Sequence, residues 1–353
     1  MKKIYLVTGA TGHLGNTLVA KLLERGECVR ALTLAGEKGI RHSGALYYEG
    51  DVRDKESLRA FFSHKDDEEL FLIHAAGIIS IREKGEKNLR AVNIDGVKNI
   101  ISLAEENKVK RMIYVSSVHA LNERGRDGII AEAEHYDSEC VVGEYAKSKA
   151  VASNMILDAV KRGLDASLVL PSGIIGPGDT GRNHLVQLCS AFLSGHLPLA
   201  VTGGYDMVDV RDVADGILSA LEKGRTGESY ILSGHYTTIR ELIGYMAAFS
   251  GKKTVLCIPI ALAKAASPLF SLFAKASGKR PLFTSYSLMT LESKSRFSHE
   301  KATMELAYEA RDISESVRDM VSYLKKEGCK INRRGEIKRT KNSPQKRFSL
   351  QGS

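Results

Sequence analysis

The chain has 353 residues, of which 43% are hydrophobic and 26% charged. This composition excludes disorder throughout and allows one large domain or two unequal ones. Lys and Arg (51) outnumber Asp and Glu (42), so the formal net charge is +9, which raises the question of an anionic partner. The five cysteines form no C-x-x-C pair, so they predict neither a disulfide framework nor a cysteine zinc site.

Two segments bear on cellular location. The N-terminal sequence MKKIYLVTGATG has four apolar residues before Thr8, fewer than the apolar core of a signal peptide needs. The longest apolar stretch, residues 255–276, is interrupted by two lysines and a proline, so we interpret it as amphipathic and not as a membrane span. We therefore expect a cytoplasmic protein without integral membrane insertion.

Short β-branched runs alternate with helical periodicity in the first half, which predicts an α/β fold with a doubly wound parallel sheet. The predicted strands are Ile4–Val7, Cys28–Thr33, Ala45–Tyr48, Leu70–His74, Arg111–Val115 and Ala166–Leu170. The predicted helices are Asn16–Arg25, Lys55–Ser63, Val92–Asn107 and Gly143–Arg162.

The pattern loosens after Pro171. We predict a dinucleotide-binding domain over residues 1–171, a smaller substrate-binding part interleaved with the sheet over 172–328, and a basic, disordered tail over 329–353. In the middle part we expect a loop at Gly173–Asn183, a strand at Tyr230–Leu232, and helices at Thr237–Ser250, Ile260–Ala276 and Ile313–Glu327.

A glycine-rich turn follows the first strand, where Thr8-Gly9-Ala10-Thr11-Gly12-His13-Leu14-Gly15 leads directly into a helix. Glycine permits a tight turn and close approach to a ligand, and the free N–H groups of a helix N-terminus bind a pyrophosphate. A turn without a ligand is the alternative. The strand before it and the helix after it favour a dinucleotide-binding Rossmann domain.

Further motifs follow in order: Asp51-Val52, His74-Ala75-Ala76-Gly77, Val92-Asn93-Ile94-Asp95-Gly96, Ser116-Ser117 and Tyr145-Ala-Lys-Ser-Lys149. With the G-x-x-G-x-x-G turn, this series resembles the extended branch of the short-chain dehydrogenase/reductases, the NAD-dependent epimerase/dehydratase family, over roughly residues 1–328. The resemblance implies cofactor contacts from Gly9, Thr11, Gly12, His13, Leu14, Gly15, Asp51, Val52, Ala75, Ala76, Gly77, Tyr145, Lys149 and Pro171.

Tyr145 and Lys149 are four residues apart in a helical segment, so both side chains emerge on one face. A nearby ammonium favours the phenolate, and we expect Lys149 to lower the pKa of Tyr145 toward neutrality. The resemblance implies that Tyr145 is the general acid and base, that Lys149 holds the nicotinamide ribose, and that Ser117 binds the substrate oxygen. Asn93 matches the asparagine of the proton relay in the classical branch.

The choice between NAD and NADP depends on the segment after the second strand. A carboxylate there would bind the ribose hydroxyls of NAD, whereas Lys or Arg would bind the 2′-phosphate of NADP. The segment holds Glu37 as well as Lys38 and Arg41, and the two cations favour NADP slightly. A solvated charged loop is an equal alternative.

The substrate is less constrained. Pro171–Asp179 and Met207–Asp215 are similar to the nicotinamide-side loop and to the start of the substrate domain in extended members. Tyr205 stands where nucleotide-sugar epimerases and dehydratases usually carry a diphosphate-binding arginine, although Arg182 or Arg211 could replace it. The residues expected around the site are apolar: Val118, Val141, Val142, Ile174 and Ile175.

The sequence is most similar to dihydroflavonol-reductase-like and 3β-hydroxysteroid-dehydrogenase-like groups. This implies an NAD(P)-dependent oxidoreductase acting on the ketone or alcohol of a small apolar molecule. A nucleotide-sugar epimerase or dehydratase with retained NAD is the alternative, and a cofactor-binding scaffold without turnover is a third interpretation.

Charge and histidine placement argue against other partners. The histidines, among them His13, His74, His119 and His135, lack the spacing of metal ligands, so we predict no metal site.

Residues 329–353 carry eight basic side chains and one acidic side chain, which leaves a net charge of +2 for residues 1–328. We therefore predict no nucleic-acid partner, and a membrane tether remains an alternative role for the tail. Two long helices pair in relatives, so a homodimer is a candidate assembly.

Overall fold

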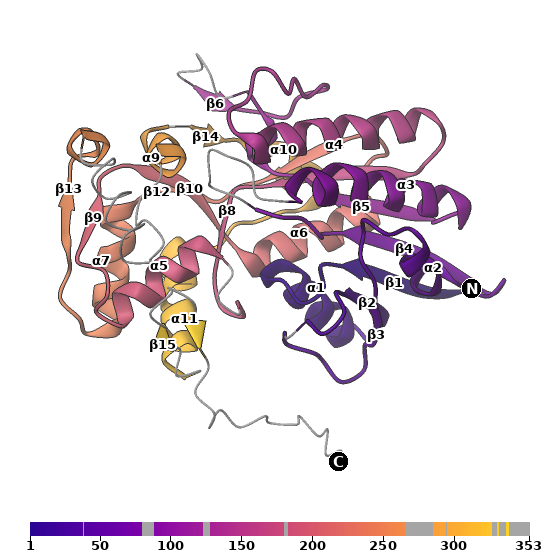
Figure 1. Cartoon of the computed structure of the whole chain (residues 1–353), viewed down its shortest axis with the longest axis horizontal. Helices are drawn as coiled ribbons and strands as arrows, with labels where there is room; N and C mark the ends of the chain where they lie inside the picture. Colours follow the sequence, from indigo (N-terminus) through magenta and orange to yellow (C-terminus); the bar gives the residue numbers. More distant parts are fainter. Residues whose placement is uncertain are drawn as a thin grey trace.

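The computed structural model describes residues 1–37, 39–79, 88–122, 128–179, 183–265, 285–293, 295–326, 330–331 and 337–338. For residues 285–287, 330–331 and 337–338 only the backbone is described. Figure 1 shows a central sheet with helices on both faces, beside a second group of helices and strands from the C-terminal half.

Seven parallel strands form the central sheet, in the order β11-β7-β5-β4-β1-β2-β3. The carboxyl ends of parallel strands meet at one edge, so the segments that follow β1, β4, β5 and β7 converge there. The strand bounds are β1 Lys2–Thr8, β2 Cys28–Thr33, β3 Leu46–Glu49, β4 Glu68–His74, β5 Arg111–Val115, β7 Ala166–Pro171 and β11 Ser229–Leu232.

Two apolar cores lie on opposite faces of this sheet. One holds buried residues of α2, α3 and α4, and the other holds those of α1, α6 and α10. The helix bounds are α1 His13–Glu24, α2 Arg59–Phe62, α3 Gly96–Glu106, α4 Glu144–Lys161, α6 Val210–Lys223 and α10 Glu300–Leu306, with short helical turns η1 Glu56–Leu58, η2 Ala91–Asp95 and η3 Val118–Ala120. The C-terminal half thus supplies one strand and two helices to the central layers.

A third core belongs to the smaller group, where α5, α7 and α11 pack on the three-stranded sheet β12-β10-β8. Its elements are β8 Gly173–Ile175, α5 His184–Leu193, β10 Gly204–Asp209, β12 His235–Thr238, α7 Ile239–Ser250 and α11 Ile313–Lys326. The remaining elements are β6 Ile129–Ile130, β9 Leu199–Val201, β13 Leu256–Ile258, α9 Ser285–Glu292, β14 Arg296–Phe297, β15 Lys330–Ile331 and β16 Ile337–Lys338.

The predicted fold class is confirmed, and all six strands predicted for the first half lie within two residues of the observed bounds. The predicted loop at Gly173–Asn183 is wrong in part, because β8 forms within it by pairing with β10. A three-residue strand between glycines gives no period that sequence reasoning can detect.

Some predictions fall on residues outside the described part of the chain. These are Lys38, Arg182, residues 266–276 of the predicted helix at Ile260–Ala276, and most of the tail at 329–353. Of that tail, residues 330–331 and 337–338 are described, and they pair as antiparallel strands. Across the described residues, no helix is both long and apolar enough to cross a membrane.

A buried arginine joins the sheet to a helix. Arg111 on β5 is 9% exposed, and its guanidinium donates to the Asp165 carboxylate, to Ser167 Oγ at 2.8 Å and to the carbonyl of Ala220 at 3.1 Å. A further bond reaches the Gly224 carbonyl at the end of α6. One side chain therefore connects β5, β7 and α6.

We expect Arg111→Met to lower the free energy of unfolding by about 2–4 kcal/mol, because it leaves buried acceptors without donors. The matched control is Arg162→Met, since Arg162 forms a solvent-exposed ion pair with Glu105 and its loss should cost under about 1 kcal/mol. Urea unfolding measures both values. Equal losses in the two variants would contradict this role of Arg111.

Candidate functional site

The glycine turn after β1 is shaped by backbone packing. Gly9 has a φ of +66°, and a Cβ there would lie 2.9 Å from the Ala76 backbone. A Cβ on Gly15 would lie 2.1 Å from the Gly9 carbonyl oxygen. Neither position accommodates a side chain, so the turn after β1 can lie directly against the segment after β4.

The start of α1 fits a pyrophosphate. Gly12 is its N-cap, and within the described residues no side chain caps this end, so the first N–H groups remain available to a ligand. Thr11 and Leu14 are buried beside the turn. The His13 imidazole Nε2 lies 2.9 Å from the Pro177 carbonyl, which brings the loop after β8 onto the same helix end. Burial lowers the pKa of His13.

A buried histidine links the ends of β1 and β4. The Thr8 hydroxyl accepts the Ala76 N–H at 3.1 Å and lies 2.7 Å from His74 Nδ1. If Thr8 donates to Nδ1, the imidazole carries its proton on Nε2, which is the arrangement that leaves the fewest polar groups unsatisfied. Among the described residues Nε2 has no hydrogen-bond partner. Burial, and then the charge of Lys149, lower the pKa of His74 to about 3.

This low pKa predicts acid sensitivity. The folded pKa of His74 lies below the ordinary value of 6.5, so the unfolded chain binds a proton that the folded chain excludes as the pH falls from 6.5 toward 3. We expect wild-type stability to fall by about 2 kcal/mol between pH 6.5 and pH 5 through this group. His74→Asn should lose that dependence.

Urea unfolding at the two pH values tests this expectation, with exposed His64→Asn as the control. The comparison uses the slope against pH and not the absolute stability, because His74→Asn also alters packing. Parallel slopes for wild type and His74→Asn would refute the assignment.

The predicted catalytic residues lie together at the carboxyl edge of the sheet. Gly143, with a φ of +93°, precedes α4, and Tyr145 and Lys149 follow in the first turns of that helix. Ser117 lies after β5, and its side chain lowers the pKa of Tyr145. All three predicted catalytic residues are less than 9% exposed, so solvent screens their interactions little.

Lys149 is held by polar and aromatic neighbours. Its Nζ donates to the Val115 carbonyl at 2.7 Å and lies 3.4 Å from the Tyr114 hydroxyl. The same Nζ sits over the Tyr114 ring, 4.9 Å from the ring centroid. A Cβ on Gly77 would lie 3.5 Å from this Nζ. The lysine therefore borders the segment that also contacts the glycine turn.

Burial decides the protonation of the pair. It lowers the pKa of Lys149 to about 7 and raises the pKa of Tyr145 to about 12, although the hydrogen bond with Ser117 lowers the latter in part. The expectation that Lys149 brings the pKa of Tyr145 toward neutrality is therefore wrong for this structure. Desolvation of the phenolate outweighs the nearby amine, which is itself desolvated and directed to a carbonyl.

Asn93 is a structural neighbour of this cluster. Its amide accepts the N–H of Ile78 at 2.8 Å and donates to the Ile78 carbonyl at 3.0 Å and to Ser148 Oγ at 3.1 Å. Ser148 Oγ in turn donates to the Tyr145 carbonyl at 2.7 Å. Asn93 thus ties the segment after β4 to the first turn of α4.

The other predicted cofactor residues border the same sheet edge. Asp51 follows β3, where Arg53 binds its carboxylate and lowers its pKa. Val52 is buried against Gly96, and a Cβ on Gly96 would lie 2.7 Å from the Val52 side chain. Pro171 is the buried last residue of β7.

The segment after β2 lies close to the glycine turn. A Cβ on Gly39 would lie 2.6 Å from Thr11 Cβ, and His42 Nε2 lies 2.7 Å from Asn16 Oδ1. The Glu37 carboxylate accepts the N–H of Leu34 at 3.2 Å. Arg41 stacks on Tyr47 at 5.1 Å and is 3.9 Å from Glu49, with 45% of its side chain exposed.

Sequence reasoning did not identify His119 and Tyr205 as functional residues. The His119 ring packs edge-on against Tyr145, with centroids 6.0 Å apart, and stacks on Tyr205 at 5.6 Å. The Tyr205 hydroxyl and His119 Nε2 are 2.9 Å apart. The position of His119, two residues after Ser117, is a signal that could have indicated proximity to the site.

The arginine considered for a diphosphate is engaged elsewhere. Arg211 donates two bonds to Asp209, at 2.9 and 2.7 Å, and one to Asp319 at 2.8 Å. These bonds raise the pKa of Arg211 and tie the start of α6 to α11. This guanidinium therefore joins α6 of the central layers to α11 of the smaller group.

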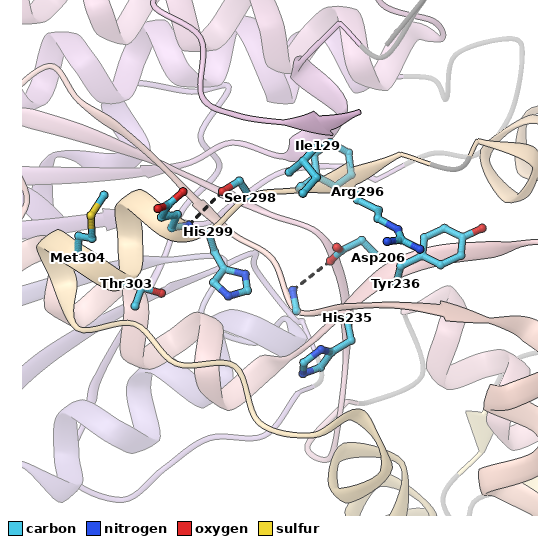
Figure 2. Close-up of a pocket in the computed structure, with 12 residues that line it drawn as sticks. Ile129, Asp206, His235, Tyr236, Arg296, Ser298, His299, Thr303 and Met304 are labelled. Atoms are coloured by element: carbon cyan, nitrogen blue, oxygen red, sulfur yellow. Dashed lines mark hydrogen bonds between the residues drawn. The ribbon is translucent and has the colours of Figure 1, made fainter. Parts of the chain in front are cut away.

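Asp206 of β10 lines a cavity of about 630 Å³ (Figure 2). Side chains alternate along a strand, so Tyr205, the preceding residue, faces the other side of β10. Asp206 accepts the Gly234 N–H at 3.0 Å, and burial raises its pKa. The lining residues are Ile129, Asp206, Gly234, His235, Tyr236, Arg296, Phe297, Ser298, His299, Glu300, Thr303 and Met304. None of the predicted catalytic residues lines this cavity.

The fold and the site together define a dinucleotide-binding protein of the Rossmann class. The model of the NAD dependent epimerase/dehydratase family matches residues 5–233, and the chain belongs to this family. The resemblance inferred from its motifs is thereby confirmed.

Three comparisons describe its relatives. The chain is 32% identical over 338 residues to sterol demethylase protein B of Methylococcus capsulatus, covering 92% of this chain and 98% of that protein. It is 30% identical over 269 residues to the 4-hydroxy-2-methyl-3-oxo-4-farnesyl-3,4-dihydroquinoline-1-oxide ketoreductase of Stigmatella aurantiaca, covering 74% and 78%. The crystal structure of gox2253 superposes with a TM-score of 0.79 and 28% identity, covering 92% of this chain and 98% of that one.

Proposed function

We propose that the protein is an NAD(P)-dependent oxidoreductase that interconverts a ketone and an alcohol on a small apolar substrate. The observation that carries the proposal is the buried cluster of Ser117, Tyr145 and Lys149 beside the segment that packs on the glycine turn. One relative is named as a ketoreductase of a farnesylated compound, which supports this substrate class.

Tyr145 suits the role of proton donor. Its pKa of about 12 keeps the phenol protonated at neutral pH, so in the reducing direction it can give a proton to a carbonyl oxygen. Ser117 Oγ accepts the His119 N–H at 3.3 Å, which leaves the hydroxyl hydrogen free to bind Tyr145 or that oxygen. The bound nicotinamide would supply or accept the hydride. Lys149 and the glycine turn are placed to hold its ribose and pyrophosphate.

A nucleotide-sugar epimerase or dehydratase with retained NAD is the alternative, because the family includes such enzymes. Two features of the described residues favour the oxidoreductase: Tyr205 faces His119, and Arg211 is paired with carboxylates. Steady consumption of NADPH or NADH with a panel of steroid and flavonoid-like ketones supports the proposal. Tightly retained cofactor with no net consumption, together with conversion of a nucleotide sugar, would reject it.

We expect Tyr145→Phe to lower kcat for carbonyl reduction by about 10²–10⁴-fold, because the substituted ring has no proton to donate. The dissociation constant for reduced cofactor, measured by fluorescence, should change less than about threefold. Tyr5→Phe, in the middle of β1, is the control and should leave kcat unchanged. Full activity in Tyr145→Phe would exclude the acid/base role.

We further propose a preference for NADP. The Glu37 carboxylate is bonded to a backbone N–H, whereas Arg41 remains partly exposed beside the same segment, where it can meet a 2′-phosphate. Arg41→Gln should raise the KM for NADPH about tenfold and leave the KM for NADH unchanged, as steady-state kinetics with each cofactor will measure. Arg59→Gln, a surface residue paired with Glu56, serves as the control. A parallel change for both cofactors would contradict this preference.

A further inference from the structure

Three aromatic side chains from three separate elements meet next to the proton donor. His119 lies on η3, Tyr145 on α4 and Tyr205 on β10. The imidazole sits between the two phenol rings, edge-on to Tyr145 at 75° and nearly parallel to Tyr205 at 17°. Edge-to-face and offset-parallel arrangements are the favourable geometries of aromatic pairs, so both contacts stabilise the central ring.

The hydrogen bond fixes that ring in rotation as well. Tyr205 Oη and His119 Nε2 are 2.9 Å apart, a normal hydrogen-bond length. The His119 backbone N–H also donates to Ser117 Oγ at 3.3 Å. One residue therefore contacts two members of the catalytic cluster, the hydroxyl of Ser117 through its backbone and the ring of Tyr145 through its side chain.

The position of Tyr205 is built into the smaller sheet. A Cβ on Gly173 of β8 would lie 2.7 Å from the Tyr205 ring, so only glycine lets the ring lie against the neighbouring strand. Tyr205 is 9% exposed and packs in the third apolar core. The Tyr205 hydroxyl therefore reaches His119 from β10, an element of the C-terminal half.

We propose that Tyr205 and His119 form a positioning pair for proton transfer. Tyr205 holds the imidazole of His119, and His119 holds the ring of Tyr145 and the hydroxyl of Ser117 in the geometry that donates a proton. Neither residue of the pair exchanges the reacting proton. The proposal rests on the proposed function, because it assumes that the proton goes to a substrate oxygen. The contacts among Tyr205, His119, Tyr145 and Ser117 do not require a substrate.

The test compares Tyr205→Phe, which removes the hydroxyl and keeps the ring, with wild type. The control is Tyr236→Phe on β12, because that tyrosine lies on the other face of the small sheet, toward the cavity in Figure 2. We expect kcat for carbonyl reduction to fall about three- to tenfold in Tyr205→Phe, the equivalent of one hydrogen bond, with KM within about twofold. Tyr236→Phe should match wild type.

A second readout needs no turnover. In cofactor-free protein labelled with 15N-histidine, NMR reports the hydrogen bonding of His119 Nε2, with the resonance assigned by its loss in His119→Gln. We expect this resonance to move in Tyr205→Phe and to stay in place in Tyr236→Phe. Unchanged melting temperatures in both variants show that the fold is intact.

The two readouts separate the possible failures. If wild type reduces no carbonyl but the His119 resonance moves in Tyr205→Phe, the proposed function is wrong, and the hydrogen bond between Tyr205 and His119 is still supported. If wild type is active and Tyr205→Phe keeps the kcat of wild type, the positioning pair is overturned, whether or not the His119 resonance moves. A rise in KM with unchanged kcat would also overturn it, since that outcome assigns Tyr205 to substrate binding.

Discussion

The site depends on one backbone contact, between the turn after β1 and the segment after β4. Gly9 approaches Ala76 so closely that a side chain at Gly9 would push the turn away from the segment after β4, and a side chain at Gly15 would collide with the backbone of Gly9 in the turn itself. Thr8 and His74 fasten the same junction by a hydrogen bond. Gly77, the next residue, then borders Lys149. The glycine turn and the cluster of Ser117, Tyr145 and Lys149 are therefore parts of one packed layer.

Burial without a neighbouring counter-charge sets the chemistry of that layer. It depresses the pKa values of His74 and Lys149 and raises that of Tyr145, which in each case favours the neutral form. The result is a neutral imidazole, a phenol that keeps its proton, and an amine that titrates near neutral pH. In the function we propose, such a cluster would give a proton to a substrate oxygen.

Local signals explain why much of the fold and part of the site were predictable. Strands β2 and β5 coincide with predicted runs of β-branched and apolar residues, and the α4 spacing alone places Tyr145 and Lys149 on one helix face. The pKa of Tyr145 was not predictable in this way, because its direction depends on how completely other segments cover the ring. The strand β8 was missed for the same reason, since it exists only through its pairing with β10.

The amino-acid sequence by itself determined the α/β class with a parallel sheet, the glycine turn before α1 and the spacing of Tyr145 and Lys149 on α4, because each depends on short-range periodicity and spacing. Only the tertiary structure decided that Tyr145 stays protonated and that His119 and Tyr205 meet it. Tyr205 lies 86 residues after His119 in the chain, and no local pattern links them. Desolvation and contacts between distant segments arise from the packing of the whole chain, so they become visible only when that packing is known.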